Sequence, residues 1–418
     1  MSHQLSAQDL MQTYQQVLTS DPRLLIDSLG VEVGVARERQ SFGQLLPQAS
    51  LSSSATSTTR RASERPIDHY SGQRYIFSVR QPLFDMQKYS AWKQSTSVKE
   101  QFKYQYEDTQ SLVRLDTVER YFGLLKAQGE LALMAEEKAV VAEKKRQIEA
   151  LFEKRLVKIT QLYEVIARLD MLEADYVELK RLLDLAKANL SELTGRPIQL
   201  LAPLSDNQNA VEPMAEVDDY VALVSERNAA LNASLKKIEV ARRHLKKQKA
   251  GHYPIIDLQF TKQETNIGFE SSVSPVTDTE VVSVNLSMPI FSGGSTSAGI
   301  YEATQQLAIA KASYDQENRR IKKELTDEYL NVKSIKRRIS ATQKSVESAE
   351  KSYRAMEQSF KYAIATVSEV LDAQQVLLQS KQNNLQVNYD YVISKTRFLY
   401  KAGLLTDDVL VDINARLK

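Results

Sequence analysis

The sequence predicts a mainly α-helical chain with a membrane β-barrel, in which long antiparallel coiled-coil helices form an α-barrel and each copy adds four strands. Two observations lead to this fold class. Residues 47–84 and 254–291 alternate apolar and polar side chains over lengths that suit two long β-hairpins. Residues 85–152 and 295–360, which follow the hairpins, contain no proline and few glycines, so each can form one long helix.

The chain is predicted to be a tandem duplication. One offset of 207 residues (254 − 47 = 289 − 82 = 291 − 84), half of the 418-residue length, relates the landmarks of the two hairpins. The landmark pairs are Pro47 and Pro254, Pro82 and Pro289, and Phe84 and Phe291. We therefore expect two structural repeats, residues 1–205 and residues 206–418, each with one hairpin.

The first repeat is expected to hold helices over 6–45, the hairpin over 47–84, a long helix over 85–152 and a return helix over 160–193. Asp21 and Pro22 interrupt the first helical stretch, because the residue before a proline disfavours helix. The long helix extends roughly 100 Å at 1.5 Å per residue, far more than a globular core needs. Gly195 and Pro197 end the return helix.

The second repeat is expected to follow the same layout, with a helix over 216–250, the hairpin over 254–291, a long helix over 295–360 and a return helix over 367–401. In this long helix, apolar side chains recur every seven residues, which is the pattern of a coiled-coil seam. The positions are Leu325, Val332, Ile339, Val346, Tyr353 and Phe360. The pattern shifts near residues 361–366, where the return helix is expected to start.

The four strands cannot close into a cylinder within one chain. Val282 and Val284 alternate with Ser283 and Asn285, so the last strand has one apolar and one polar face. An open sheet edge in lipid leaves backbone groups unpaired, so copies of the chain must pool their strands. Two copies give eight strands, whereas three give twelve and leave an open lumen. The alternative is a small water-soluble sheet that caps a coiled-coil stalk.

Composition excludes several classes of function. The chain has no cysteine, which removes disulfides, thiolate metal sites and a cysteine nucleophile. A net charge of +2 provides no general attraction to nucleic acid. The four histidines show no metal-ligand spacing, and the glycines match no phosphate-binding loop. We therefore predict that the protein is not an enzyme and has no catalytic residue, metal, cofactor or nucleic-acid partner.

Five short segments, in order along the duplicated frame, carry a resemblance to a known family. They are Asp9-Leu10-Met11-Gln12-Thr13-Tyr14-Gln15-Gln16 with Asp21-Pro22 after it, Gln81-Pro82-Leu83-Phe84-Asp85, Leu193-Thr194-Gly195, Pro289-Ile290-Phe291-Ser292-Gly293-Gly294 and Ser368-Glu369-Val370-Leu371-Asp372-Ala373. With these segments, nearly the whole chain resembles the TolC family of outer-membrane channel proteins. The last segment is the most specific, because it is similar to the family's acidic V-L-D-A segment.

The resemblance implies a homotrimer with a twelve-strand barrel in the outer membrane of a Gram-negative bacterium and a large helical tunnel in the periplasm. It also implies contact with outer-membrane lipid, a periplasmic adaptor protein and an inner-membrane transporter of the ABC type. The segment 81–85, followed by Lys88 and Tyr89, looks closest to the secretion branch of the family. We therefore expect an exit duct for polypeptides in type I secretion. Small-molecule or multidrug efflux is the alternative, and a soluble coiled-coil scaffold is the alternative of another class.

The resemblance further implies that Glu369 and Asp372 ring the narrow periplasmic end of the channel. At 100° per residue the two acids share one helix face with Ala365, Val376 and Gln379. The side chains of Val367, Leu371, Gln374 and Leu378 lie roughly opposite, where they can pack. In a trimer each acidic position becomes three carboxylates around one axis, which favours cations. The alternative is a solvated acidic pair.

The turns between long and return helices depart from the family's pattern. Arg155 and Ala363 stand where the family usually has glycine. Gln161 and Ala365 stand where the resemblance leads one to expect an acidic and a basic residue that link neighbouring helices. That charge link cannot form from these positions, so closure must have another basis.

Our hypothesis is that packing by Phe360 closes the channel, with weaker polar contacts from Thr160 and Gln161. Candidate contacts for the adaptor are Leu156, Val157 and Lys158, although these residues can equally be a plain loop tip.

Overall fold

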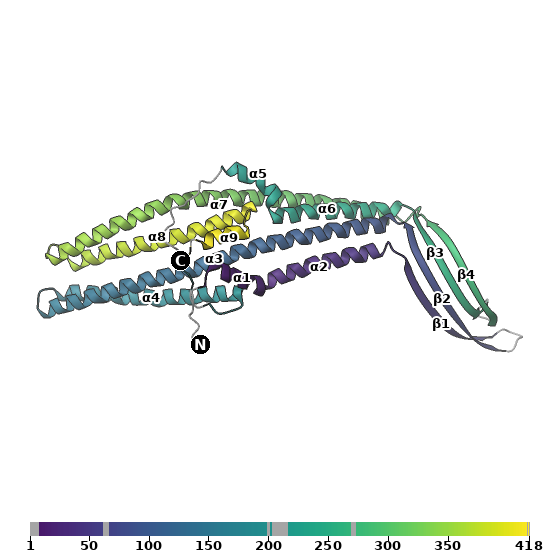
Figure 1. Ribbon diagram of the computed structural model, residues 1–418, viewed down its shortest axis with the longest axis horizontal. Helices are drawn as coiled ribbons and strands as arrows, with labels where there is room; N and C mark the ends of the chain where they lie inside the picture. Colours follow the sequence, from purple (N-terminus) through teal and green to yellow (C-terminus); the bar gives the residue numbers. More distant parts are fainter. Residues whose placement is uncertain are drawn as a thin grey trace. The chain divides into compact units, whose positions relative to one another are not determined.

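The computed structural model describes residues 8–61, 67–198, 201–202, 216–268, 273–415 and 417 (Figure 1). The chain divides into two compact units. The strand unit comprises the described residues of 27–105 and 230–317, and the helical unit comprises those of 1–26, 106–229 and 318–418. The two long helices, α3 (Met86–Glu153) and α7 (Ser295–Lys361), contribute residues to both units.

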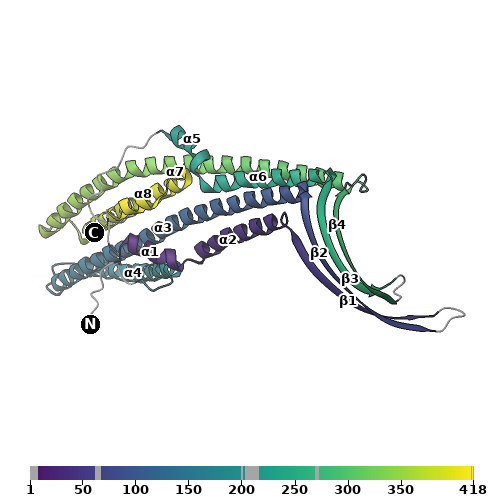
Figure 2. The same ribbon diagram turned by 45° about the vertical axis from the view of Figure 1, so that its right-hand side comes forward.

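The strand unit carries an antiparallel sheet in the order β1 (Gln48–Arg60), β2 (Asp68–Phe84), β3 (Ile255–Ile267) and β4 (Val273–Ser287). The two predicted hairpins lie side by side as one curved layer in both views (Figures 1 and 2). The register places Val79 opposite Phe260 and Phe260 opposite Val282. Among the described strands, β1 and β4 each have a neighbour on one side only, so the sheet has two open edges.

The two faces of this sheet differ in polarity, as the alternation in the sequence predicts. On one face, Val282 and Val284 of β4 are 70% and 65% exposed. On the other face, Arg80 of β2 pairs with Asp257 of β3 at 2.6 Å. The side chain of Asn285 in β4 also donates to Asp257, at 3.3 Å. One face of the sheet is therefore apolar and exposed, and the other face carries a network of polar side chains.

The part of the helical unit next to the turns that follow α3 and α7 is built on one apolar cluster. In both views α4 (Ile159–Thr194) runs back along α3, and α8 (Val367–Ala402) runs back along α7 (Figures 1 and 2). The cluster joins α3, α4 and α8 through the buried side chains of Met134, Val141, Ile148, Val165, Leu172, Val367, Leu371 and Leu378. The predicted coiled-coil seam of α7 is also confirmed, since Leu325 and Val332 are fully buried and the four later positions are half-buried.

A second cluster packs the first and last described helices against α3 and α8. Leu10 of α1 (Leu10–Ser20) and Leu410 of α9 (Asp407–Asn414) are both fully buried. They pack with Tyr121 and Phe122 of α3 and with Tyr389 of α8. Helix α9 lies beyond the last element that the sequence predicts.

The first predicted helix, over residues 6–45, is two helices, α1 and α2 (Pro22–Gly43), with the predicted break at Asp21. Helix α1 begins at Leu10, because Asp9 forms a capping box and its carboxylate accepts the N–H of Gln12 at 2.7 Å. Residues 6 and 7 lie outside the described residues.

The prediction of one helix over 216–250 is wrong. The structure has α5 (Val217–Arg227) and α6 (Ala229–Lys249), followed by the short 3-10 helix η1 (Ala250–His252). Asn228 separates α5 from α6 with an extended backbone, and its side-chain amide donates to the carbonyl of Lys401 at 3.1 Å.

The second hairpin is also shorter than the predicted 254–291. Strand β4 ends at Ser287, two residues before Pro289, which has no N–H for a ladder.

Gly403 lies close to the backbone at the break between α5 and α6. It ends α8 in the left-handed conformation, with φ 72°. A Cβ atom at this position would lie 2.5 Å from the carbonyl oxygen of Arg227 and 2.8 Å from the nitrogen of Asn228. Gly195 ends α4 with a similar φ of 67°, but there a Cβ would first meet the Ser20 side chain, at 3.3 Å. Two features therefore require glycine at position 403, namely the left-handed turn and the close approach of two backbone segments.

We expect Gly403→Ala to destabilise the protein more than Gly195→Ala. Both variants force alanine into the left-handed region at roughly 1–2 kcal/mol, but only Gly403→Ala also drives a methyl group into backbone atoms. Thermal unfolding in detergent, followed by far-ultraviolet circular dichroism, measures both losses. An equal loss of stability in the two variants would contradict the close approach of Gly403 to the backbone of residues 227 and 228.

Candidate functional site

The turn between α3 and α4 closes around a left-handed residue that is not glycine. Arg155 has φ 58°, and its N–H donates to the carbonyl of Phe152 at 2.8 Å. The N–H of Leu156 donates to the carbonyl of Leu151 at 2.9 Å, which completes the paired hydrogen bonds of a Schellman motif. The position where the resemblance leads one to expect glycine is therefore the position with positive φ.

The turn between α7 and α8 has the same construction. Ala363 has φ 59°, and its N–H donates to the carbonyl of Phe360 at 3.0 Å. The N–H of Ile364 donates to the carbonyl of Ser359 at 2.9 Å. Both turns thus hold a side chain where the backbone geometry favours glycine.

The predicted adaptor contacts lie on the first turn but differ in exposure. Leu156 is 68% exposed and Lys158 is exposed at the start of α4. Val157 instead packs against the apolar cluster of α3, α4 and α8. The second turn offers two further exposed apolar side chains, Tyr362 at 76% and Ile364 at 79%. The sequence shows these residues, but their exposure follows only from the turn geometry.

Glu369 closes a capping box at the start of α8. Its carboxylate accepts the backbone N–H of Thr366 at 2.8 Å and the Thr366 hydroxyl at 3.0 Å. The N–H of Glu369 in turn donates to that hydroxyl at 3.3 Å. The hydrogen bond from the Thr366 N–H, with help from the hydroxyl, lowers the pKa of the Glu369 carboxyl. This carboxylate therefore has a structural partner within its own chain.

Asp372 lies one turn further along α8 and is exposed, like Glu369. On the opposite face Val367, Leu371, Gln374 and Leu378 are all buried. The predicted division of α8 into a packed face and an acidic face is confirmed. The role of the two acids in a pore stays a prediction.

Phe360 packs within its own chain. It is half-buried against the apolar cluster that includes Val367 and Ile148. The amine of Lys144 on α3 lies 5.4 Å from the centre of its ring. Thr160 is exposed and Gln161 half-buried in the first turn of α4. The described packing of Phe360 is thus against the cluster of α3, α4 and α8, and its joint role with Thr160 and Gln161 in a gate stays a prediction.

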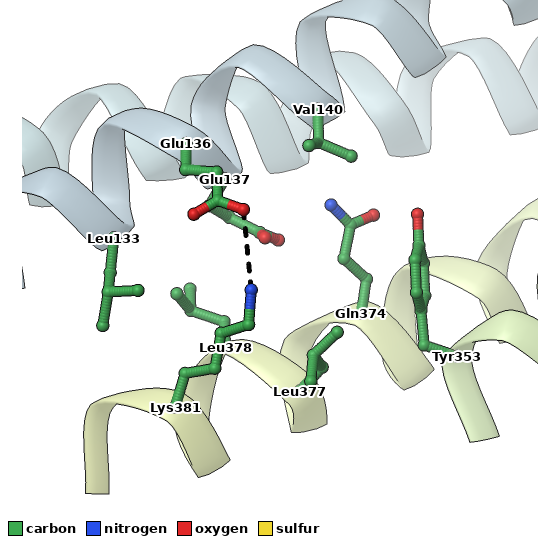
Figure 3. A pocket seen from close by; sticks show the side chains of 9 residues that line it. All are labelled: Leu133, Glu136, Glu137, Val140, Tyr353, Gln374, Leu377, Leu378 and Lys381. Atoms are coloured by element: carbon green, nitrogen blue, oxygen red, sulfur yellow. Dashed lines mark ion pairs between the residues drawn. The ribbon is translucent and has the colours of Figure 1, made fainter. Parts of the chain in front are cut away.

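A polar pocket that sequence reasoning missed lies between α3, α7 and α8 (Figure 3). It has a volume of about 100 Å³ and is lined by Leu133, Glu136, Glu137, Val140, Tyr353, Gln374, Leu377, Leu378 and Lys381. Lys381 of α8 pairs with Glu136 of α3 at 3.5 Å. Glu137 is only 9% exposed, and Gln374 is 2% exposed. A carboxylate in the interior of a helix bundle looks like a surface residue in the sequence, which is why no signal pointed to it.

Polar atoms in this pocket are incompletely paired. One carboxylate oxygen of Glu137, Oε1, and both polar atoms of the Gln374 amide have no hydrogen-bond partner among the described residues. Burial raises the pKa of the Glu137 carboxyl, and the neighbouring Gln374 amide, together with the cations Arg168 and Lys381, only partly offsets this. Burial likewise raises the pKa of the Tyr353 hydroxyl across the pocket.

The described residues show no group of three or more histidine, aspartate or glutamate side chains that could hold a metal ion. No helix in the described part of the chain is both long enough and apolar enough to cross a membrane.

Comparison with known proteins decides the family. The sequence pattern of the family described as "Outer membrane efflux protein" matches residues 13–196 and again residues 221–402. The chain belongs to this outer membrane efflux protein family.

Individual family relatives match over nearly their whole length. The outer membrane protein TolC of Vibrio cholerae is 25% identical over 423 residues, which cover 100% of this chain and 96% of that protein. The alkaline protease secretion protein AprF of Pseudomonas aeruginosa is 26% identical over 416 residues, 95% of this chain and 85% of that protein. The solved Campylobacter jejuni CmeC outer membrane channel has a TM-score of 0.82 at 17% identity, over 98% of this chain and 90% of that chain.

Membership of the outer membrane efflux protein family confirms the predicted resemblance and fold class. The protein is an outer-membrane channel with an α-barrel and a β-barrel, and its large helical part belongs in the periplasm. The soluble coiled-coil scaffold, which the sequence alone left open, is not the fold of this family.

Because Glu137 is buried in this pocket, we expect the free energy of unfolding to depend on pH. Because the pKa of Glu137 is higher in the folded protein than its ordinary value of 4.5, protonation stabilises the fold. That contribution is fully present below pH 4.5 and is lost as the pH rises through the raised folded pKa. At neutral pH the ionised carboxylate therefore weakens the bundle.

We expect Glu137→Gln to stabilise the helical unit at neutral pH by about 1 kcal/mol, the lower end of the penalty for a buried unpaired polar group. Thermal unfolding at neutral pH and again below pH 4.5 measures the effect, which should shrink at the lower pH. Glu136→Gln is the matched control, since Glu136 is 63% exposed and paired with Lys381. A gain from Glu136→Gln as large as that from Glu137→Gln would refute the role of burial.

Proposed function

We propose that three copies of this chain form an exit duct through the outer membrane for polypeptides of a type I secretion system. A periplasmic adaptor and an inner-membrane ABC transporter deliver the cargo to the helical end. The duct is a passive conduit, and the protein is not an enzyme. Outer-membrane lipid surrounds the pooled strands of the three copies.

The open edges of the sheet are the main observation in support of a trimer. The exposed apolar face around Val282 and Val284 suits lipid, and the polar face around Arg80 and Asp257 suits a water-filled interior. A sheet with this division and two unpaired edges needs further strands in a membrane. Three copies supply twelve strands, enough for an open lumen.

The polypeptide route is favoured by the relatives and by one junction. AprF is named as an alkaline protease secretion protein, and it matches 95% of this chain. The junction of residues 81–85, which looks closest to the secretion branch, links β2 to α3 in the structure. Small-molecule efflux is the second candidate, and the description of the family itself favours it.

The two repeats, residues 1–205 and 206–418, are part of the proposal. Equivalent turns support them, because Arg155 and Ala363 are both left-handed and lie 208 residues apart (363 − 155). The glycines that end the return helices, Gly195 and Gly403, are also 208 residues apart (403 − 195). The family pattern matches once within each half.

The helical end of the duct holds the proposed constriction and docking residues. Asp372 and Glu369 provide a double ring of carboxylates, and Phe360 provides the packing that keeps the end closed, aided by Thr160 and Gln161. The exposed Leu156, with Val157 and Lys158, contacts the adaptor. Support comes from the exposure of the acidic face of α8 and from the turn geometry.

We expect Asp372→Asn to roughly halve the preference of the channel for cations, because one of two carboxylate rings is removed. The reversal potential of single channels in a planar bilayer under a salt gradient measures this preference. Asp372 is the better target because Glu369 also caps α8. Asp175→Asn, at an exposed carboxylate of α4, is the control and should leave the reversal potential unchanged. An unchanged value for Asp372→Asn would remove the acidic ring from the proposal.

Deleting the gene in the source bacterium separates the two transport routes. If the duct serves secretion, at least one polypeptide disappears from the culture medium and accumulates in the cells. Restoring the gene returns that polypeptide to the medium. An unchanged set of secreted polypeptides, together with greater sensitivity to toxic small molecules, would reject secretion in favour of efflux.

A further inference from the structure

The strand unit contains a cationic pocket that the channel function does not use. Its volume is about 320 Å³. Its walls are Met86, Tyr89, Ser90 and Lys93 from the start of α3, Arg243, Lys246 and Lys249 from α6, and Tyr253 from the segment before β3. Four of these eight side chains carry positive charge, two are tyrosines, and none is acidic.

Three of the cations lack an acidic partner. Lys93, Lys246 and Lys249 form no ion pair with any of the described residues. Arg243 shares the carboxylate of Glu239, at 2.8 Å, with Arg242. One acid thus serves two arginines, while the positive charge of the three amines around the same cavity is not balanced by a paired acid. A bound anion would balance this charge.

Helix stabilisation does not account for the whole cluster. Lys246 and Lys249 lie in the last turn of α6, where cations interact favourably with the helix dipole. Lys93 lies near the start of α3, where the dipole gives a cation no benefit. Its amine instead lies 4.0 Å from the centre of the Trp92 ring and 5.7 Å from that of Tyr89. An aromatic wall therefore holds Lys93 at the pocket.

The pocket adjoins the end of the membrane strands. Strand β2 ends at Phe84, two residues before α3, and β3 begins at Ile255, two residues after Tyr253. Between strand and pocket, Leu83 and Phe84 are 56% and 42% exposed. Tyrosine and lysine at the edge of an apolar band are typical of the depth at which lipid headgroups lie.

We propose that this pocket binds the phosphate of an anionic phospholipid in the periplasmic leaflet of the outer membrane. Lys93, Lys246 and Lys249 contact the phosphate oxygens, and Tyr89 and Tyr253 pack against the glycerol region. The free phosphate ion shares the same chemistry, but the exposed apolar residues next to the pocket favour a ligand with acyl chains. This site is independent of whether the duct carries polypeptides or small molecules.

Trp92 allows a direct test, because it is the only tryptophan of the chain. The whole channel, in neutral detergent, is titrated with phosphatidylglycerol or phosphatidylcholine whose acyl chains carry bromine atoms that quench tryptophan. Half-maximal quenching should need at least about fivefold less phosphatidylglycerol than phosphatidylcholine, because the choline cation of phosphatidylcholine cancels the negative charge that attracts the lysines, each of which contributes about 1 kcal/mol. Equal concentrations for the two lipids would overturn the proposal without any variant.

The triple variant Lys93→Gln, Lys246→Gln, Lys249→Gln should lose the preference for phosphatidylglycerol. A matched triple variant, Lys336→Gln, Lys344→Gln, Lys351→Gln, changes three exposed lysines of α7 and should keep it. Circular dichroism and migration as an assembled channel show that each variant is folded. A preference that survives in the pocket variant refutes the assignment of these lysines.

Inorganic phosphate distinguishes the two sources of the anion. Millimolar phosphate should leave quenching by phosphatidylglycerol nearly unchanged. If phosphate alone abolishes the quenching, the pocket is a site for the free ion, and the lipid proposal is wrong.

Discussion

The unpaired backbone groups along β1 and β4 are the constraint on which the rest of the structure depends. The four antiparallel strands form hydrogen bonds with one another but leave a row of unpaired backbone N–H and C=O groups at each edge. Lipid offers no partner for those groups, so in the proposed trimer strands of other copies complete the sheet. In that proposal the two faces have different surroundings, with Val282 and Val284 toward lipid and the Arg80–Asp257 pair toward the interior.

Most of the fold could be predicted because its signals are local. The alternation of Val282 to Asn285 has period two, and the seam from Leu325 to Phe360 has period seven, so neither needs tertiary information. The break at Asn228 could not be predicted, since its contacts are with the distant end of α8, where Gly403 approaches the backbone of Arg227 and Lys401 accepts a hydrogen bond from Asn228. Helix α9 was missed for a similar reason. It is only eight residues long, and the burial of Leu410 depends on partners from distant parts of the chain.

For the candidate site, the sequence predicted which face of α8 is packed, but not which side chains of different helices meet. Helical geometry correctly separated the acidic side of α8 from its packed side. The resemblance to the family identified Arg155 and Ala363 as unusual, and both have positive φ. The pocket around Glu137 escaped prediction, because in the sequence this residue is one more charge on a long charged helix. Only the approach of α8 buries it against Gln374.

The two acids of α8 differ in a way that bears on their roles. The carboxylate of Glu369 is held by Thr366, so capping alone can explain an acid at that position. Asp372 has no hydrogen-bond or ion-pair partner within the described chain, and its face of the helix does not contribute to the core. A carboxylate that its own chain leaves unused is the stronger candidate for a function between copies. If the acidic ring exists, Asp372 therefore carries its selectivity, and Glu369 contributes charge while it fixes the start of the helix.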